Sequence, residues 1–163
     1  YQLSGTQWIP YLYLDMGKYQ MPIEYEAWYS EDAYNKNAIN YWNIPRLEED
    51  DRYFFFTAVR QKYIQKGENE NDCKFIIYDK KAKEGFVVKD ENGMKITDDI
   101  LGGPNFWPRW STDNFYITTM EWSDLEQWTK EEKHILSPTL QEQFETWGED
   151  TNQLIVLCKK NNI

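Results

Sequence analysis

The sequence predicts a mainly β protein built of antiparallel, β-propeller-like blades, with a helical insertion near the C-terminus. Three observations lead to this prediction. Short apolar runs alternate with turn-forming residues, most of these runs are apolar on both faces, and helix-capping signals occur only late in the chain. Residues 1–163 are expected to form a single domain, because this length is ordinary for one domain.

Five apolar runs are the main predicted strands. They are WIPYLYLD (8–15), RYFFFTAVR (52–60), CKFIIYD (73–79), NFYITTMEW (114–122) and QLIVLCK (153–159), and a shorter strand is expected at 86–89. The second and third runs are expected to form a hairpin, because the polar stretch QKGENEND (65–72) between them is rich in turn residues. In the fourth run, alternation places Phe115, Ile117 and Thr119 on one face and Tyr116, Thr118, Met120 and Trp122 on the other.

Runs that are apolar on both faces are typical of strands covered on both sides. A parallel α/β sheet would need a helix between its strands, and YDKKAKEGF (78–86) leaves no room for one. A β-sandwich has one wet face and would show cleaner alternation. Propeller blades fit the pattern better, because they are small antiparallel sheets packed face to face. About two blades can be counted, which is fewer than a closed propeller needs.

Two helices are predicted between residues 123 and 148, where they separate the last two strands. Ser123 is expected to cap the first helix, because Glu126 follows at capping-box spacing. Ser137 is expected to cap the second helix, with Pro138 at its first position. The apolar face of this second helix is expected to consist of Leu140, Phe144 and Trp147.

The composition makes several classes of partner poor candidates. The formal net charge is −10, and the cationic stretches are short, whereas a nucleic-acid binder needs a basic patch that neutralises phosphates. Nucleic acid and anionic membrane surfaces are therefore not expected as partners. No apolar stretch approaches about 20 residues, so the chain is not expected to span a membrane.

Cysteine and histidine usage argues against a metal centre. Cys73 and Cys158 both lie in apolar runs and are interpreted as small buried side chains, with a single disulfide between neighbouring strands as the alternative. His134 is the only histidine, and no metal-ligand spacing is present. No metal and no cofactor are expected.

Four segments in order carry a resemblance to a known family. They are YLYLDMGKYQMP (11–22), FIIYDKKAKEGFVVKDE (75–91), DDILGGPNFWPRW (98–110) and QLIVLCKK (153–160). Together they resemble the C-terminal half of six-bladed β-propeller proteins of Bacteroides-type gut bacteria, many of which are predicted envelope lipoproteins of unknown function. The resemblance implies that the chain is a fragment or a reduced form of such a propeller. It also implies an extracytoplasmic location, in the periplasm or at the outer-membrane surface. It supplies no catalytic residue.

The segment GGPNFWPRW (102–110) combines chain-breaking residues with three large aromatic side chains. It is expected to be a connection that enters a blade, with Gly102 and Gly103 adopting backbone angles that other residues avoid. Trp107 is expected to be a buried wedge, and Trp110, next to polar Ser111, is the better candidate for an exposed ring.

The same segment holds the candidate ligand-binding residues. Flat aromatic faces beside a guanidinium and two carboxylates have the chemistry to bind a sugar ring or a peptide. The candidate set consists of Trp107, Arg109, Trp110, Asp98 and Asp99.

The predicted function is a non-catalytic binding or interaction module of the bacterial cell envelope, with a glycan or a protein as its ligand. The alternative is a carbohydrate-active enzyme that uses a carboxylate pair. The densest acidic cluster, EEDD (48–51), is interpreted as a solvated loop, so no catalytic residue is assigned. A two-blade piece would leave an apolar blade face uncovered, which predicts a homodimer through that face.

Overall fold

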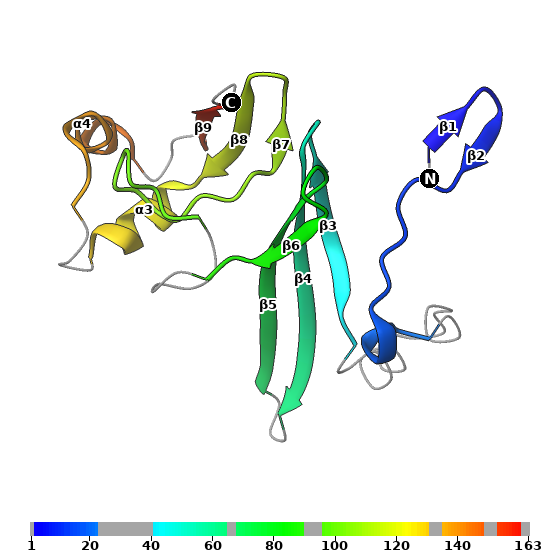
Figure 1. Cartoon of the computed structure of the whole chain (residues 1–163). Coiled ribbons are helices and arrows are strands. Elements are labelled where there is room, and N and C mark those ends of the chain that lie inside the picture. Colours follow the sequence, from blue (N-terminus) through cyan, green and yellow to red (C-terminus); the bar gives the residue numbers. More distant parts are fainter. Residues whose placement is uncertain are drawn as a thin grey trace. The chain divides into compact units, whose positions relative to one another are not determined.

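The computed structural model describes residues 2–22, 41–64, 68–89, 96–130, 135–148 and 153–160. In this part of the chain the fold is mainly β and its sheets are antiparallel, as predicted (Figure 1). The chain divides into two compact units. Unit 1 comprises Tyr1–Pro45 and Ala58–Cys73, and unit 2 comprises Arg46–Thr57 and Lys74–Ile163. The expectation of one domain over residues 1–163 stays a prediction.

The described strands form three sheets. The first pairs β1 (Gln2–Ser4) with β2 (Gln7–Ile9), and the second has the order β3 (Asn43–Glu49), β4 (Tyr53–Ile64), β5 (Glu68–Asp79) and β6 (Glu84–Val87). The third has the order β7 (Trp110–Ser111), β8 (Phe115–Met120) and β9 (Leu154–Lys159). None of these sheets closes on itself, so the structure confirms antiparallel sheets without confirming a propeller.

The predicted hairpin exists, and its strands are longer than predicted. β4 runs to Ile64 and β5 begins at Glu68, so the expected loop is wrong for residues 68–72, and residues 65–67 lie outside the described part of the chain. An ion pair between the two strands stabilises the polar end of the hairpin. Arg60 Nη2 lies 2.7 Å from Asp72 Oδ2, and the Arg60 guanidinium stacks on the ring of Trp42.

The run WIPYLYLD is not a single strand, contrary to the prediction. Only its first two residues belong to β2, and the chain after Ile9 has no strand structure until Gln20 bridges to Trp42. Pro10 follows β2 directly and has no backbone N–H to donate to a ladder, which gives the physical reason for the stop.

The prediction that the strands are buried on both faces is correct for β4 and wrong for β9. Phe54, Phe55 and Phe56 are consecutive residues of β4, and all three are buried. In β9, by contrast, half-buried and exposed residues alternate along the strand. The apolar composition of QLIVLCK therefore does not reflect burial on both sides of the strand.

The two predicted helices are present between β8 and β9. They are α3 (Trp122–Thr129) and α4 (Pro138–Thr146), and Ser137 caps α4 by accepting a hydrogen bond from the Leu140 N–H at 3.3 Å. Ser123 does not cap α3, contrary to the prediction. The N-cap is Glu121, whose backbone N–H donates to the Asp124 carboxylate at 3.2 Å. The helix thus starts early enough to include Trp122, which stacks on Phe144 of α4.

The main core of unit 2 lies between these helices and the sheet formed by β7, β8 and β9. Its buried members come from β8, from both helices and from the chain around them: Met120, Leu125, Leu136, Leu140 and Trp147. Leu154 and Val156 of β9 pack against this group. The predicted apolar face of α4 is confirmed, because Leu140 and Trp147 are buried and Phe144 is half-buried.

The segment 102–110 enters the third sheet, as expected for a connection. Gly102 has a φ of +70°, and a Cβ at this position would clash with the carbonyl oxygen of Ile135, so only glycine fits. The same expectation is wrong for Gly103, whose φ is not positive. The segment is less irregular than predicted. Phe106 exchanges two backbone hydrogen bonds with Ile96, and Trp110 begins β7.

Trp107 is a buried wedge, as predicted. Its side chain is 6% exposed and contacts Phe55 of β4 and Phe75 of β5 edge to face, with ring centroids 5.8 and 4.8 Å apart. Because Trp107 precedes β7 by three residues, this contact joins two sheets inside unit 2.

Cys73 and Cys158 are not joined by a disulfide, and both are half-buried. The alternative of a long-range bridge is therefore wrong. Cys158 lies on β9, where it pairs with Tyr116 of β8.

Replacing Trp107 by Ala should lower the stability of the fold by about 3–5 kcal/mol, as for other buried aromatic side chains. Replacing the half-exposed Trp110 by Ala should cost less than about 1 kcal/mol, because its ring already contacts solvent. Thermal melts of the two variants test the difference, and equal losses of melting temperature would contradict it.

Candidate functional site

The sheet formed by β7, β8 and β9 has two faces of opposite character. Opposite residues in antiparallel strands point to the same face, and successive residues point to alternate faces. The register pairs Trp110 with Ile117 and Ile117 with Leu157, so these three side chains form one cross-strand row. We call their side of the sheet the outer face. Its members are Trp110, Phe115, Ile117, Thr119, Ile155, Leu157 and Lys159.

The opposite side of the same sheet, the inner face, is directed to the core. It carries the pairs Tyr116–Cys158, Thr118–Val156 and Met120–Leu154. Thr118 and Met120 are buried, and the remaining four residues are half-buried. The predicted division into two faces is thus confirmed for Phe115–Met120, and the more buried face is the one that contains Tyr116. Trp122, which was predicted on the same face, lies in α3 instead.

The outer face exposes large apolar side chains. Trp110 is 50% exposed, Leu157 56% and Ile155 64%. Ile155 and Leu157 are neighbours on one face of β9, and Trp110 lies at the other end of the row, across half-buried Ile117. A single exposed apolar residue is ordinary, but three on one face of a sheet form a patch of the kind that marks an interaction site. This outer face is the candidate functional site.

The predicted ligand-binding residues differ in exposure and in the contacts that they make. Trp110 lies on the outer face and Arg109 beside it is exposed, so both are accessible to a ligand. Trp107 is buried against Phe55 and Phe75, which makes it a packing residue that supports the entry to β7.

Asp98 and Asp99 belong to the turn that precedes the glycines. The Asp98 carboxylate accepts backbone hydrogen bonds from Ile100, Leu101 and Gly103 at 3.2, 2.9 and 3.3 Å, which shows that it organises this turn. Asp99 is exposed. Burial raises the pKa of Cys158, and the negative charges of Asp98 and Asp99 add to the shift. The two carboxylates thus lie close enough to Cys158, a residue of the inner face, to affect its pKa.

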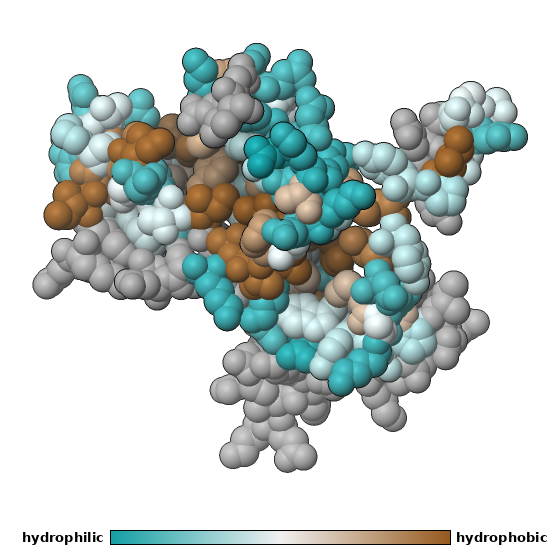
Figure 2. Space-filling model, viewed as in Figure 1, coloured by the Kyte–Doolittle hydropathy of each residue, from teal (hydrophilic) through white to brown (hydrophobic). Residues whose placement is uncertain are grey.

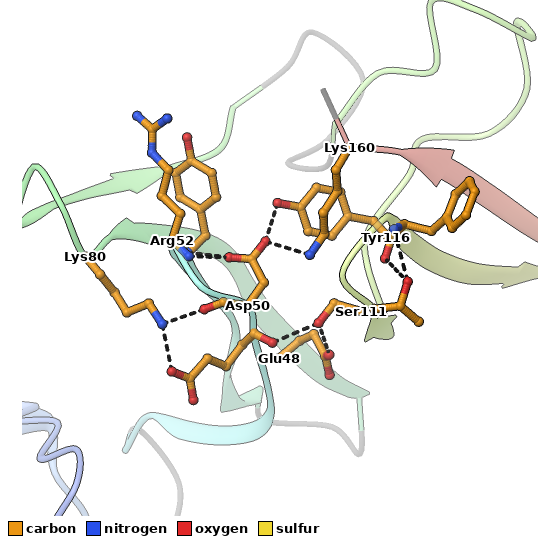
Figure 3. A network of polar contacts seen from close by, with 11 residues as sticks. Glu48, Asp50, Arg52, Lys80, Ser111, Tyr116 and Lys160 are labelled. Carbon is orange, nitrogen blue, oxygen red and sulfur yellow. Dashed lines mark hydrogen bonds and ion pairs between the residues drawn. The ribbon is translucent and has the colours of Figure 1, made fainter. Parts of the chain in front are cut away.

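A polar network centred on Asp50 is the second feature of unit 2 (Figure 3). The Asp50 side chain is 7% exposed and lies in the turn between β3 and β4. Its Oδ1 accepts hydrogen bonds from the backbone N–H groups of Arg52 and Tyr53 at 2.8 and 2.6 Å. Its Oδ2 accepts a hydrogen bond from the Tyr116 hydroxyl at 2.6 Å and lies 3.1 Å from Lys160 Nζ.

Two neighbouring acids are held in the same way, so the interpretation of EEDD as a solvated loop is wrong for Glu48, Glu49 and Asp50, whereas Asp51 is exposed. Glu48 Oε1 accepts a hydrogen bond from the Ser111 hydroxyl at 2.8 Å, and Glu49 Oε1 accepts one from Lys80 Nζ at 2.8 Å. Glu48 and Glu49 are residues of β3, and both are half-buried. The cluster is solvated in part only, because donors from β7 and from the chain after β5 reach it.

The protonation states in the network follow from these contacts. Burial of Asp50 acts to raise its pKa, but hydrogen bonds from Tyr116, the two backbone N–H groups and Lys160 outweigh burial, so the pKa is lowered. Burial and the bond to Asp50 raise the pKa of the Tyr116 hydroxyl well above its usual range. Asp50 is therefore ionised and Tyr116 is protonated at neutral pH.

Such a network is suited to holding strands together rather than to catalysis. A Tyr with a raised pKa is a poor general base, and a carboxylate whose two oxygens are both occupied by donors is poorly placed to take a proton from a substrate. The Lys160 side chain, only 14% exposed, also lies over the Tyr116 ring at 4.5 Å from its centroid. The network links the β3–β4 turn to β8 and to the residue that follows β9.

Sequence reasoning missed two parts of this arrangement. The apolar run at 153–159 predicts a strand that is covered on both faces, but Ile155 and Leu157 are exposed. A run of aliphatic residues is equally suited to a strand with one exposed face. The role of Asp50 had no sequence signal, because its partners are 66 and 110 positions away along the chain.

The remaining features of the described residues concern metal binding, membrane-spanning helices and exposed apolar side chains. Within these residues no group of three or more His, Cys, Asp or Glu is placed to hold a metal ion, and no helix is long and apolar enough to cross a membrane. Hydrophobic residues also reach the surface around α3 and α4 in the view of Figure 2. Ile135, which precedes α4, is the most exposed large apolar side chain of those described, at 84%.

Comparisons of the chain with models of protein families, with curated proteins and with solved structures found no match in any of the three. The resemblance to six-bladed envelope propellers stays a prediction.

The Asp50 network should make the stability of the protein depend on pH. Because the pKa of folded Asp50 lies below the unfolded value of about 3.9, its contribution is present above that pH and is lost as the pH falls through the folded pKa. Urea unfolding is measured at a series of pH values between 7 and 3. As the pH falls, the free energy of unfolding should decrease less for Asp50→Asn than for the wild type. Asp113→Asn, at an exposed position, is the control and should follow the wild type. Identical pH profiles for Asp50→Asn and the wild type would contradict the network.

Proposed function

We propose that this chain is a non-catalytic binding or interaction module and that the outer face of β7, β8 and β9 is its binding surface. One observation carries the proposal. Trp110, Ile117 and Leu157 form a cross-strand row whose two ends are 50% and 56% exposed, while the opposite face of the same sheet supplies the core. A face that the fold does not need for its own core and that nevertheless exposes large apolar side chains has the character of a docking surface.

A protein ligand with apolar side chains suits this surface best. The neighbours of Trp110 along the row are aliphatic, and they offer dispersion and hydrophobic contact without hydrogen bonds. A sugar ring stacked on Trp110 would need polar groups around it to bind its hydroxyls. On the outer face such groups are confined to Thr119 and Lys159, and the Thr119 hydroxyl oxygen is buried.

A glycan ligand is the second candidate, and the exposed indole of Trp110 beside exposed Arg109 favours it. In that case the contact would be confined to the β7 end of the surface and would not require Leu157. The two ligand classes therefore differ in which residues of the outer face they use.

The cellular setting of the proposal rests on the sequence resemblance alone. We propose that the module belongs to the C-terminal half of a six-bladed propeller and acts outside the cytoplasm, in the periplasm or at the outer-membrane surface of a bacterium. The antiparallel sheets of three and four strands support only the propeller part of this proposal, because propeller blades are small antiparallel sheets.

Selection of a random peptide library on the immobilised chain tests the protein-ligand proposal. We expect enrichment of peptides with aromatic and aliphatic residues, and we expect Trp110→Ala and Leu157→Ser each to weaken their binding by roughly tenfold or more, as for central residues of a contact. Ile135→Ser is the matched control, because it removes an even more exposed isoleucine that is not on the outer face.

The outcomes separate the alternatives. Peptides that bind Trp110→Ala and Leu157→Ser as tightly as the wild type would show that the outer face is not the binding surface. Binding on a glycan array that is lost in Trp110→Ala and kept in Leu157→Ser would favour the glycan ligand over the protein ligand.

A further inference from the structure

One edge of β9 has no strand partner among the described residues of unit 2. β9 is the last strand of the order β7-β8-β9, so among the described strands it has a neighbour on one side only. Edge strands present unpaired N–H and C=O groups, and proteins usually protect them with prolines, bulges or several charged residues. The sequence of β9, LIVLCK, contains no proline or glycine and a single charge at its end.

The backbone hydrogen bonds show which residues of β9 have groups directed to the free edge. The Lys160 N–H donates to the Asn114 carbonyl oxygen at 2.8 Å, and bonds to the same neighbouring strand recur at every second residue. Cys158, Val156 and Leu154 therefore direct their backbone groups toward β8, and Ile155, Leu157 and Lys159 direct theirs outward. The outward set is also the set whose side chains lie on the outer face.

We propose that two copies of this chain pair through β9, edge to edge and antiparallel, about a two-fold axis at Val156. In this arrangement Ile155 of each copy lies opposite Leu157 of the other, and each such pair exchanges two backbone hydrogen bonds. The two sheets become one sheet of six strands, and their outer faces become continuous.

Charge complementarity selects this register. With the axis at Val156, Lys159 lies opposite Gln153 of the second copy, and the Gln153 side-chain amide donates to Glu121 Oε1 at 2.8 Å. Lys159 is thus brought beside the carboxylate of Glu121. With the axis at Leu157, one of the alternatives that also keep the outer faces together, Lys159 would lie opposite Ile155 and have no acidic neighbour in the row. With the axis at Cys158, Lys159 would lie opposite Leu157, which is also uncharged.

This pairing shares Ile155 and Leu157 with the proposed binding surface, but it depends on the backbone edge of β9 and on Lys159 and not on Trp110, so Trp110→Ala separates the two proposals. It is also more specific than the dimer predicted from the sequence, which packs one blade face on another. The net charge of −10 opposes association of two copies at low salt. At about 0.15 M salt, repulsion beyond about 8 Å is screened, and this is the condition for the test.

The first measurement is the mass of the full chain by sedimentation equilibrium as a function of concentration. The monomer has a mass of 19.7 kDa, and we expect a concentration-dependent rise toward the dimer. Lys159→Glu should weaken the association roughly tenfold, because two exposed ion pairs are replaced by repulsion. The double variant Glu121→Lys with Lys159→Glu should restore it. Trp110→Ala should leave the association unchanged.

The second measurement tests the register directly. Chains carrying Ile155→Cys or Leu157→Cys, each with Cys73→Ser and Cys158→Ser, are mixed and oxidised. The proposed register predicts a disulfide between the two different variants in excess over disulfides within either variant alone, because Ile155 lies opposite Leu157. Both positions are exposed, so the substitutions are compatible with folding.

Several results would overturn the proposal. The first is a mass that stays at the monomer value up to about 100 μM. The second is an association that Lys159→Glu does not weaken. The third is a disulfide between the two different variants that forms no more often than disulfides within either variant. Loss of peptide binding in Trp110→Ala with an intact dimer would separate the binding function from the dimer. A wild type that is monomeric and still binds peptides would contradict the dimer and leave the proposed binding function unaffected.

Discussion

The carboxylate of Asp50 is the constraint on which the arrangement of unit 2 depends. One oxygen orders the β3–β4 turn through two backbone N–H groups, and the other binds Tyr116 of β8 and Lys160 after β9. A buried carboxylate is tolerated only when its oxygens are satisfied, so the turn and the third sheet must come together. Phe55 then packs edge to face against both Tyr116 and Trp107. The inner face of the sheet formed by β7, β8 and β9 is thereby directed to the core. The outer face is consequently the side that stays open.

Local signals in the sequence were sufficient for much of the fold. Alternation in NFYITTMEW predicted both faces of β8, and the Ser137–Pro138 pair predicted the start of α4. Predictions failed where a contact distant in sequence decides the structure. The polar end of the β4–β5 hairpin is strand, with Arg60 and Asp72 paired across it. The start of α3 is a different case, because Glu121 and Asp124 form a local capping arrangement that the choice of Ser123 overlooked.

The candidate site was predictable only in part, for the same reason. Neighbouring residues distinguish Trp107 from Trp110, since one is flanked by Phe106 and Pro108 and the other by Arg109 and Ser111. The row that joins Trp110 to Leu157 depends on the register of three strands, and β8 and β9 are separated by both helices. Composition alone also could not tell that the apolar residues of β9 divide between core and surface, because isoleucine, leucine and valine suit a strand in either setting.

A double-mutant cycle between Asp50→Asn and Tyr116→Phe tests the central role of the Asp50 carboxylate most directly. Each single variant should be destabilised, and the double variant should be more stable than the sum of the two losses predicts. We expect a coupling of about 1.5–3 kcal/mol, because a hydrogen bond to a charged, buried acceptor is lost in each. Asp50→Asn combined with Ser123→Ala, an exposed position in α3, should be additive within about 0.5 kcal/mol. A coupling between Asp50 and Tyr116 no larger than in this control would contradict the account.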